Sequence, residues 1–242
     1  MDGLTTILFD LDGTLLPMDL EKFQELYFKS LSMEFSDLID PRKLGGLVWE
    51  CTLEMISDKS TRTNREVFME AMGSRVGHDS LAEYERRFMD YYDRNFEYVK
   101  GSTSLSEPMR EAVAILRENG YTLAIATNPV FPEAAVLRRI EWAGLSRDDF
   151  KLVTNFDNSH YCKPNLEYYE EILKTLGKSA EECMMVGNDE LEDMVPKRLG
   201  MRTYLVTDNL VPGNPKGPEP DHKGTSVDFL GFIKSGVQAG RT

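Results

Sequence analysis

Beyond Gly101 the sequence alternates between short apolar runs of strand length and longer segments of helical periodicity. Strands that alternate with helices in this way favour a mainly parallel sheet with helices on both faces. The sequence therefore predicts an α/β fold with a doubly wound sheet. The expected strands are 121–126, 150–153, 183–186 and 203–206, and the expected helices are 107–119, 132–142, 166–176, 191–199 and 226–233.

A first strand, at residues 6–9, stands apart from this region. The segment between them carries apolar residues at helical spacing, so we expect two units: an α/β core of 1–16 and 102–242, and a helical cap of 17–101. The insert leaves at the carboxyl end of the first strand, where open α/β sheets bind ligands. The expected cap helices are 20–31, 44–56, 65–72 and 80–99.

Proline and glycine mark the expected breaks in this pattern. In the cap they cluster at 40–41, 45–46 and 73–77, and these clusters are expected to separate its helices. Four prolines fall within 211–220, which predicts an irregular surface loop.

Composition limits the location and the partners of the chain. An apolar fraction of 41% and a charged fraction of 29% are typical of a soluble globular protein, and no apolar stretch has transmembrane length. The N-terminus lacks the features of a signal peptide, so we expect a cytoplasmic protein with no membrane partner. The net charge of −13 argues against nucleic acid as a partner. Three scattered cysteines, Cys51, Cys162 and Cys183, indicate reduced thiols.

Two carboxylates, Asp10 and Asp12, directly follow the first strand. A regular strand would direct them to opposite faces, but a turn at Gly13 allows them to converge. Two buried acids without partners are costly, so their convergence requires a cation or a shared proton. This pattern predicts a metal-assisted aspartate nucleophile with a second aspartate as acid and base.

Further polar residues follow the later strands or precede a helix of the core. A parallel sheet brings the carboxyl ends of its strands to one edge, so we expect these residues to meet Asp10 and Asp12 there. The residues are Thr127, Asn128, Lys163, Asn188, Asp189 and Asp193.

In order and spacing these residues resemble the four motifs of the haloacid dehalogenase superfamily. The first motif is Asp10-x-Asp12-Gly13-Thr14, the second Thr127, the third Lys163, and the fourth Asp189 with Asp193. The resemblance extends from about Thr6 to Asp228. It implies a Rossmann-like core, with the helical insert as the cap that members of this family place between the first two motifs.

The resemblance also implies roles for these residues. Asp10 is expected to attack phosphorus and form an aspartyl-phosphate. Mg²⁺ is expected as the cofactor, held by Asp10, the backbone carbonyl of Asp12 and Asp189, with Asp193 as a further ligand or as the partner of one. The residues expected to bind the phosphoryl group are Thr127, Asn128 and Lys163.

Asp12 narrows the reaction class. An aspartate two residues after the nucleophile resembles phosphatases and phosphomutases of this family, whereas its dehalogenases lack that residue. Asp12 is expected to protonate the leaving-group oxygen and then to activate water. The leading prediction is a Mg²⁺-dependent phosphomonoester hydrolase, monomeric or homodimeric, that acts on a small phosphorylated metabolite. A phosphomutase and a catalytically idle phosphate-binding or regulatory protein remain as alternatives.

Simpler interpretations compete at several positions. Asn128 could cap a helix, Asn188 could serve only in a turn, and Asp189 with Asp193 could favour a helix dipole. Glu190 and Glu192 are expected to be such first-turn acids.

The cap carries no recognisable motif. One hypothesis is that Arg42 or Lys43 reaches the substrate, although solvated charge is the commoner state of such residues. The stripe of Tyr84, Phe88, Tyr91 and Tyr92 is expected to form the core of the cap, and His78, His160 and His222 are expected at the surface.

Overall fold

The computed structural model describes residues 1–213 and 217–239. The described residues form one sheet of six strands, in which every pair of neighbours is parallel. The strands are β1 (Thr6–Phe9), β2 (Thr122–Ile125), β3 (Leu152–Val153), β4 (Cys183–Gly187), β5 (Arg202–Val206) and β6 (His222–Gly224).

The strand order is β3-β2-β1-β4-β5-β6, so β1 lies between β2 and β4. Thr6 pairs with Thr122 on one side and with Cys183 on the other. The order changes direction at β1, and ligands bind outside the carboxyl ends of the strands at such a point. The predicted doubly wound, mainly parallel sheet is confirmed, and the chain leaves β1 at this position.

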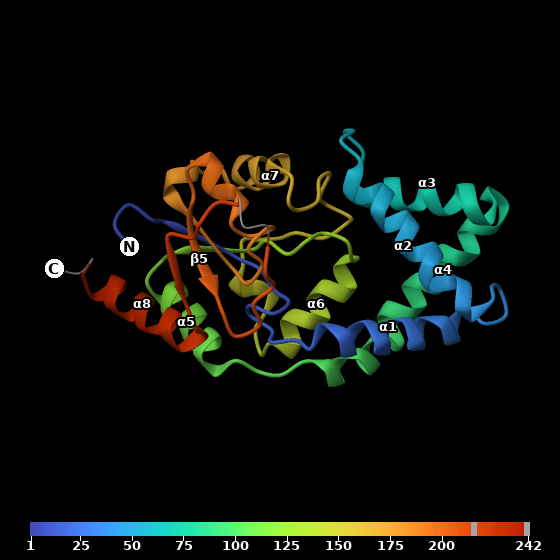
Figure 1. Ribbon diagram of the computed structural model, residues 1–242, viewed down its shortest axis with the longest axis horizontal. Coiled ribbons are helices and arrows are strands. Elements are labelled where there is room, and N and C mark those ends of the chain that lie inside the picture. Colours follow the sequence, from blue (N-terminus) through green and yellow to red (C-terminus); the bar gives the residue numbers. More distant parts are fainter. Residues whose placement is uncertain (214–216, 240–242) are drawn as a thin grey trace.

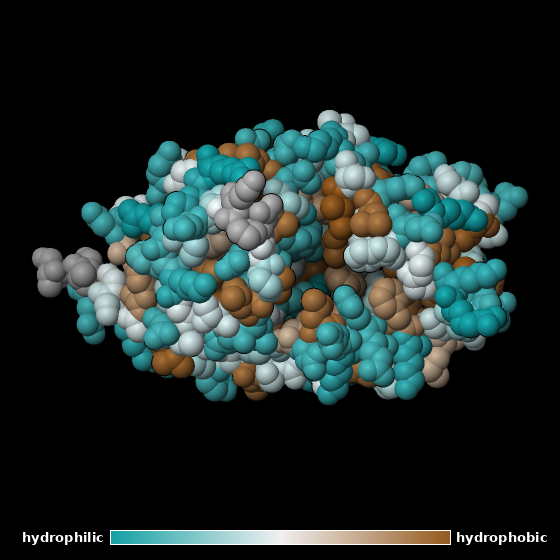
Figure 2. All heavy atoms as spheres, viewed as in Figure 1, coloured by the Kyte–Doolittle hydropathy of each residue, from teal (hydrophilic) through white to brown (hydrophobic). Residues whose placement is uncertain are grey.

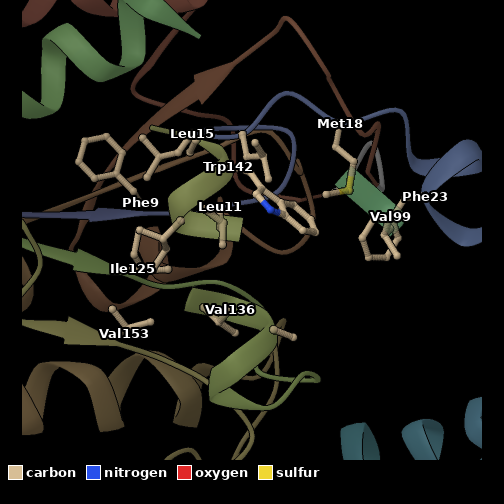
Figure 3. Close-up of a cluster of buried hydrophobic side chains, with 14 of the residues drawn as sticks. Phe9, Leu11, Leu15, Met18, Phe23, Val99, Ile125, Val136, Trp142 and Val153 are labelled. Carbon is tan, nitrogen blue, oxygen red and sulfur yellow. The ribbon is translucent and has the colours of Figure 1, made fainter. Parts of the chain in front are cut away.

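Successive residues of β1 contribute to different hydrophobic clusters. Ile7 and Phe9 belong to a large cluster, whereas Leu8 belongs to a smaller one on the other face of the sheet. Figure 3 shows Phe9 in the large cluster with Ile125 and Val153 of the neighbouring strands. The large cluster includes residues of α5 (Glu107–Glu118), α6 (Glu133–Trp142) and α8 (Ser226–Ala239), and the small one includes residues of α7 (Leu166–Leu176).

Of the α-helices between β1 and β2, the first four gather at one end of the molecule, far from α8 (Figure 1). They are called the cap helices here: α1 (Leu20–Glu34), α2 (Pro41–Ser57), α3 (Asn64–Val76) and α4 (His78–Arg94). Thr63 and Glu66 form a reciprocal capping box at the start of α3. The expected burial of the aromatic stripe of α4 is confirmed for Tyr84, Phe88, Tyr91 and Tyr92.

One expected break in the cap is wrong, and another is narrower than expected. Gly45 and Gly46 lie inside α2, because Asp40 caps this helix and Pro41 begins it. The break expected at 73–77 is confirmed at Gly77, which has φ of 87° and separates α3 from α4. Gly73 lies inside α3, where a Cβ would come 2.8 Å from His78 Nδ1, so glycine allows α3 and α4 to approach closely. The long helix expected over 80–99 is divided in the structure: α4 ends at Arg94, and a separate 3₁₀ helix, η1 (Phe96–Ser102), follows.

The core also departs from the expected elements in two places. The helix expected over 191–199 is reduced to the 3₁₀ helix η4 (Val195–Leu199), where Pro196 lacks the N–H that an α-helix requires. The short strand β6 was not predicted, because its sequence His-Lys-Gly has no apolar pattern. Within the expected loop 211–220, residues 214–216 lie outside the described part of the chain.

Candidate active site

Strand β1 brings Asp10 to the carboxyl edge of the sheet. The Asp10 amide N donates to Val186 O at 2.9 Å, so the pairing with β4 extends to this residue. Asp10 follows Phe9 and continues the alternation of the strand, which turns it to the side of Leu8 that α7 covers. Only 8% of Asp10 is exposed.

The chain turns at Gly13 directly after this carboxylate. Gly13 has φ of 83°, a conformation that favours glycine, and its amide N donates to Leu16 O at 2.8 Å. A Cβ on Gly13 would lie 2.3 Å from Asn188 Nδ2. Thr14 Oγ1 donates to Asn188 Oδ1 at 2.9 Å. Asn188 therefore joins the turn after β1 to the loop after β4.

Lys163, three residues before α7, lies in the centre of the site. Its side chain is fully buried, and Nζ donates to Asp10 Oδ1 at 2.8 Å and to Asp193 Oδ1 at 2.7 Å. One cation thus joins the expected nucleophile of the first motif to a carboxylate of the fourth. The structure brings together residues that lie 153 and 30 positions from Lys163 in the sequence.

The fourth motif forms a hydrogen-bonded turn after β4. The Asp189 amide N donates to Asp193 Oδ2 at 2.9 Å. Asp189 Oδ1 accepts from the amide N of Leu191 at 2.7 Å and from that of Glu192 at 2.8 Å. Asp193 is fully buried between this turn and Lys163. Its carboxylate accepts from the turn through Oδ2 and from Lys163 through Oδ1, and so links the two.

Asp12 has a different cationic partner, which the sequence did not indicate. Arg139 of α6 donates from Nη1 to Asp12 Oδ2. The Arg139 side chain is only 1% exposed, although it lies in the middle of an ordinary helical pattern. No motif in the sequence marks Arg139, and the one available signal is a charge within an otherwise apolar helix face.

Thr127 and Asn128 lie directly beyond β2, as expected. Thr127 is buried, and its backbone O accepts from Thr154 Oγ1 at 2.9 Å and from Tyr168 OH at 2.8 Å. Asn128 Nδ2 donates to Glu192 Oε1 at 2.9 Å. Helix α6 begins five residues beyond Asn128 and has Pro132 at its N-cap, so the helix-cap interpretation of Asn128 is wrong.

Glu192 also differs from the expectation of a first-turn acid, because no helix begins at this position. Burial raises its pKa to about 7, and Lys163 opposes this shift. Its hydrogen bond to Asn128 ties the loop after β2 to the loop after β4. Sequence reasoning missed this contact because Glu192 stands among other acids that favour a helix start.

Burial also shifts the ionisation of the central carboxylates. It raises the pKa of Asp10 to about 8, although the attraction of Lys163 opposes the shift. It raises the pKa of Asp12 against the attraction of Arg139, and it raises the pKa of Asp189 as well. For Lys163, burial acts to lower the pKa, but Asp10 and Asp193 raise it well above its usual value.

These carboxylates are chemically suited to a hard cation. Among the described residues no group of three or more histidine, cysteine or acidic side chains is arranged to hold a metal ion. Mg²⁺ needs fewer, because it commonly binds one or two carboxylates and completes its shell with water and substrate phosphate. Asp10 and Asp189 are carboxylates whose charged forms burial disfavours, and a cation beside them would offset that cost. This donor set therefore fits a partly hydrated magnesium ion.

Arg42 and the cysteines show no arrangement that serves this chemistry. Arg42 is 89% exposed on its side chain and pairs with Asp40 at 2.8 Å, so its geometry gives no support to a contact with substrate. The three cysteines are free and buried, and burial raises the pKa of the Cys162 thiol to about 12.

No helix in the described part of the chain has both the length and the apolar character needed to cross a membrane.

A cavity of about 1020 Å³ lies between the cap helices and the loops after β2 and β3. Figure 2 shows a hollow there, with hydrophobic residues at its edge. Phe131, in the loop between β2 and α6, lines the cavity and also lies 4.5 Å from Arg139 Cζ, measured to the centre of its ring. The larger apolar lining residues are Leu20, Phe23, Tyr27, Phe28, Val48, Trp49, Phe68, Met69, Phe88, Met89, Tyr92, Val130, Phe131 and Phe156.

Known proteins resemble the chain over most of its length. The pyrophosphatase PpaX of Halalkalibacterium halodurans is 28% identical over 204 residues, which cover 84% of this chain and 83% of that protein. A phosphoglycolate phosphatase of Mesorhizobium japonicum is 27% identical over 83% of this chain and 81% of its own length. A probable phosphatase IndB of Dickeya dadantii is 29% identical over 83% of this chain and 80% of its own length.

Solved structures show the same fold. A HAD phosphatase from Thermococcus onnurineus superposes with a TM-score of 0.58 at 19% identity, covering 95% of this chain and 98% of that one. The L-2-haloacid dehalogenase of Xanthobacter autotrophicus superposes with a TM-score of 0.56 at 16% identity, covering 96% of this chain and 98% of that one. The family model of haloacid dehalogenase-like hydrolases matches residues 4–194, which include all four motifs. This chain therefore belongs to the haloacid dehalogenase-like hydrolases.

Proposed function

We propose that this chain is a Mg²⁺-dependent phosphomonoester hydrolase that works through an aspartyl-phosphate. The observation that carries the proposal is the buried contact of Lys163 Nζ with both Asp10 and Asp193 at the carboxyl edge of the sheet. A buried lysine beside a nucleophilic carboxylate suits the transfer of a dianionic group. The names of three relatives, two phosphatases and a pyrophosphatase, support the broader class of enzymes that transfer a phosphoryl group to water.

In the proposed reaction Asp10 attacks phosphorus and forms the aspartyl-phosphate. Lys163 offsets negative charge on Asp10 and on the transferring group, and Thr127 and Asn128 hold phosphoryl oxygens. Asp12 gives a proton to the leaving-group oxygen and then takes one from the attacking water. Asp10 would thereby be regenerated.

The proposed magnesium site consists of Asp10, Asp189 and the backbone carbonyl of Asp12, with Asp193 as a further ligand or as the residue that fixes Asp189. The hydrogen bond from Asp189 N to Asp193 Oδ2 supports the second of these roles for Asp193. When bound, Mg²⁺ would supply positive charge that lowers the repulsion between the carboxylate and the phosphoryl group.

We further propose that residues 17–101 act as a cap whose cavity receives the organic part of the substrate. A volume of about 1020 Å³ is at the upper end of the range for small-molecule pockets, far beyond the needs of a glycolate group. The lining favours an apolar or aromatic leaving group without negative charge. The charged lining residues are one arginine, Arg65, and five acids, Glu85, Asp90, Asp93, Glu133 and Asp157.

A panel of phosphate esters with Mg²⁺ tests the function. We expect release of inorganic phosphate that stops with EDTA and returns with added Mg²⁺, and higher kcat/KM for aryl and long alkyl phosphates than for phosphoglycolate. Conversion of a sugar phosphate to its isomer without phosphate release would identify a phosphomutase instead. The absence of turnover across the panel with Mg²⁺, Mn²⁺ and Co²⁺ would refute hydrolysis, and chloride release from 2-chloropropionate would indicate dehalogenation.

A further inference from the structure

Arg139 is a buried cation in contact with the first motif. It is 1% exposed, and the acidic group bound to it is Asp12. Burying a guanidinium is costly unless it is paired and hydrogen-bonded, so a helix of the core would tolerate leucine or methionine more easily at this position. Arginine at this position therefore indicates a task that its charge or its shape performs.

The guanidinium is restrained at three points. Nε donates to the backbone O of Ala135 at 3.2 Å, one turn earlier in α6, and Nη1 donates to Asp12 Oδ2. Cζ lies 4.5 Å from the centre of the Phe131 ring. Because the guanidinium is planar and rigid, these contacts fix the direction in which it holds the carboxylate.

The two oxygens of Asp12 differ as a result. Oδ2 is bound to Arg139, whereas Oδ1 is buried and has no hydrogen-bond partner among the described residues. Asp10, by contrast, is bound to Lys163 through Oδ1. Each carboxylate of the motif thus has its own cation, and one oxygen of Asp12 stays free.

We propose that Arg139 is the positioning residue of Asp12: it binds Oδ2 and leaves Oδ1 to exchange protons with the leaving group and with water. This inference rests on the proposed phosphatase function. In the first step an Asp10 oxygen bonds to phosphorus, the ester P–O bond breaks, and the proton on Asp12 Oδ1 moves to the departing oxygen. In the second step water bonds to phosphorus, its proton passes to Asp12 Oδ1, and the bond between Asp10 and phosphorus breaks.

A residue that acts through a general acid has a kinetic signature. Phenyl phosphate and p-nitrophenyl phosphate are similar in shape, but the phenolate is the more basic leaving group and depends more on protonation. The constant kcat/KM reports the steps up to departure of that group. Loss of Arg139 should therefore lower kcat/KM more for phenyl phosphate than for p-nitrophenyl phosphate. General damage to the fold would lower kcat/KM for both substrates by the same factor.

The experiment is a double-mutant cycle of Arg139→Gln and Asp12→Asn, with both substrates and Mg²⁺. We expect Arg139→Gln to lower kcat/KM by about 100-fold for phenyl phosphate and by about 10-fold or less for p-nitrophenyl phosphate. In the Asp12→Asn background the same change should cost less than about 3-fold, because its target is absent. Arg138→Gln is the matched control, since Arg138 is a half-exposed neighbour that pairs only with Glu141 among the described residues, and it should leave both constants unchanged.

If circular dichroism shows that the Arg139→Gln variant is not folded, the experiment uses Arg139→Lys in its place. Lysine keeps the buried charge but lacks the planar fork, so the same selective loss is expected with a smaller magnitude. Equal losses on both substrates, or losses that add in the double mutant, would overturn the positioning role while leaving the phosphatase function intact. A wild-type enzyme that releases no phosphate from either ester would instead refute the proposed function.

Discussion

At the residue scale, the two aspartates of the first motif differ in the cation that each contacts. Lys163 binds Asp10 and Arg139 binds Asp12, and these cations come from opposite faces of the sheet. The two carboxylates are therefore set in different electrostatic surroundings although one residue separates them. This difference supports a division of labour between a nucleophile and a proton carrier.

The division of labour predicts opposite outcomes for two asparagine variants. Asp12→Asn should still bind Mg²⁺ and should accumulate the aspartyl-phosphate, with kcat lowered by about 100- to 10,000-fold, because it cannot activate water. Asp10→Asn should form no phosphoenzyme at all. Acid quenching of enzyme mixed with ³²P-labelled substrate measures the trapped fraction. Label on the Asp10→Asn protein would show that another residue is the nucleophile.

Lys163 is also a structural residue, because its removal leaves two buried carboxylates without their cation. Lys163→Met should lower the free energy of unfolding by about 3–5 kcal/mol, measured by urea denaturation without metal. Lys174→Met, at an exposed position of α7, should change it by less than about 0.5 kcal/mol. Equal stability of the two variants would mean that Asp10 and Asp193 are compensated without Lys163.

At the scale of elements, the turn after β1 depends on both the conformation and the small size of Gly13. Gly13→Ala should cost about 1–2 kcal/mol for its positive φ and about 1–3 kcal/mol more for displacing Asn188. Gly120→Ala is the matched control, since Gly120 has φ of 78° and open space where a Cβ would lie, so only the first cost applies. Urea denaturation of both variants gives the difference, and equal costs would show that Asn188 moves freely.

Helix α4 carries a charged cluster in which Glu83 contacts Arg86 and Arg87. Hydrogen bonds from Arg86 and Arg87 lower the pKa of Glu83 to about 2, from an ordinary value near 4.5. A carboxylate whose pKa is lowered in the folded state stabilises the fold at any pH above its ordinary pKa. This contribution is lost as the pH falls toward about 2. Glu83→Gln should therefore lower the melting temperature at neutral pH, and the difference from wild type should shrink between about pH 4.5 and pH 2.

A control variant isolates this effect. When Arg86 and Arg87 are both changed to glutamine, Glu83→Gln should no longer alter the pH dependence of the melting temperature. A pH-dependent difference that persists in this background would assign it to another acid.

At the scale of the whole molecule, the cap and the core together form a cavity that neither forms alone. Thr52 of α2 lines this cavity, whereas the neighbouring Leu53 is 47% exposed and does not. Thr52→Phe should raise KM for an aryl phosphate several-fold and leave KM for a small alkyl phosphate unchanged, because only the larger leaving group needs the space. Leu53→Phe should alter neither constant. Equal effects of Thr52→Phe on both substrates would place the leaving group elsewhere.

The sequence was sufficient wherever the relevant pattern is local. Short apolar runs that alternate with segments of helical spacing predicted the parallel sheet and its covering helices. Burial on both faces makes a strand continuously apolar, whereas a helix buried on one face has apolar residues three or four positions apart. The motif residues were found because each follows a strand or precedes a helix at the edge where ligands bind. Residues without such a local mark, such as Gly45 inside α2 and the His-Lys-Gly run of β6, were assigned wrongly or missed.

Which residues meet was decided by the tertiary structure. Arg139 lies 127 positions from Asp12, and Glu192 lies 64 positions from Asn128, so no spacing rule connects either pair. Their contacts depend on how α6 and the loop after β4 pack around the carboxyl edge of the sheet. By itself the sequence determined the fold and the chemical groups of the site. The packing of distant segments decided which cation each aspartate contacts and what shape the cap leaves for a substrate, because burial removes water and gives each charge only the partners that the fold supplies.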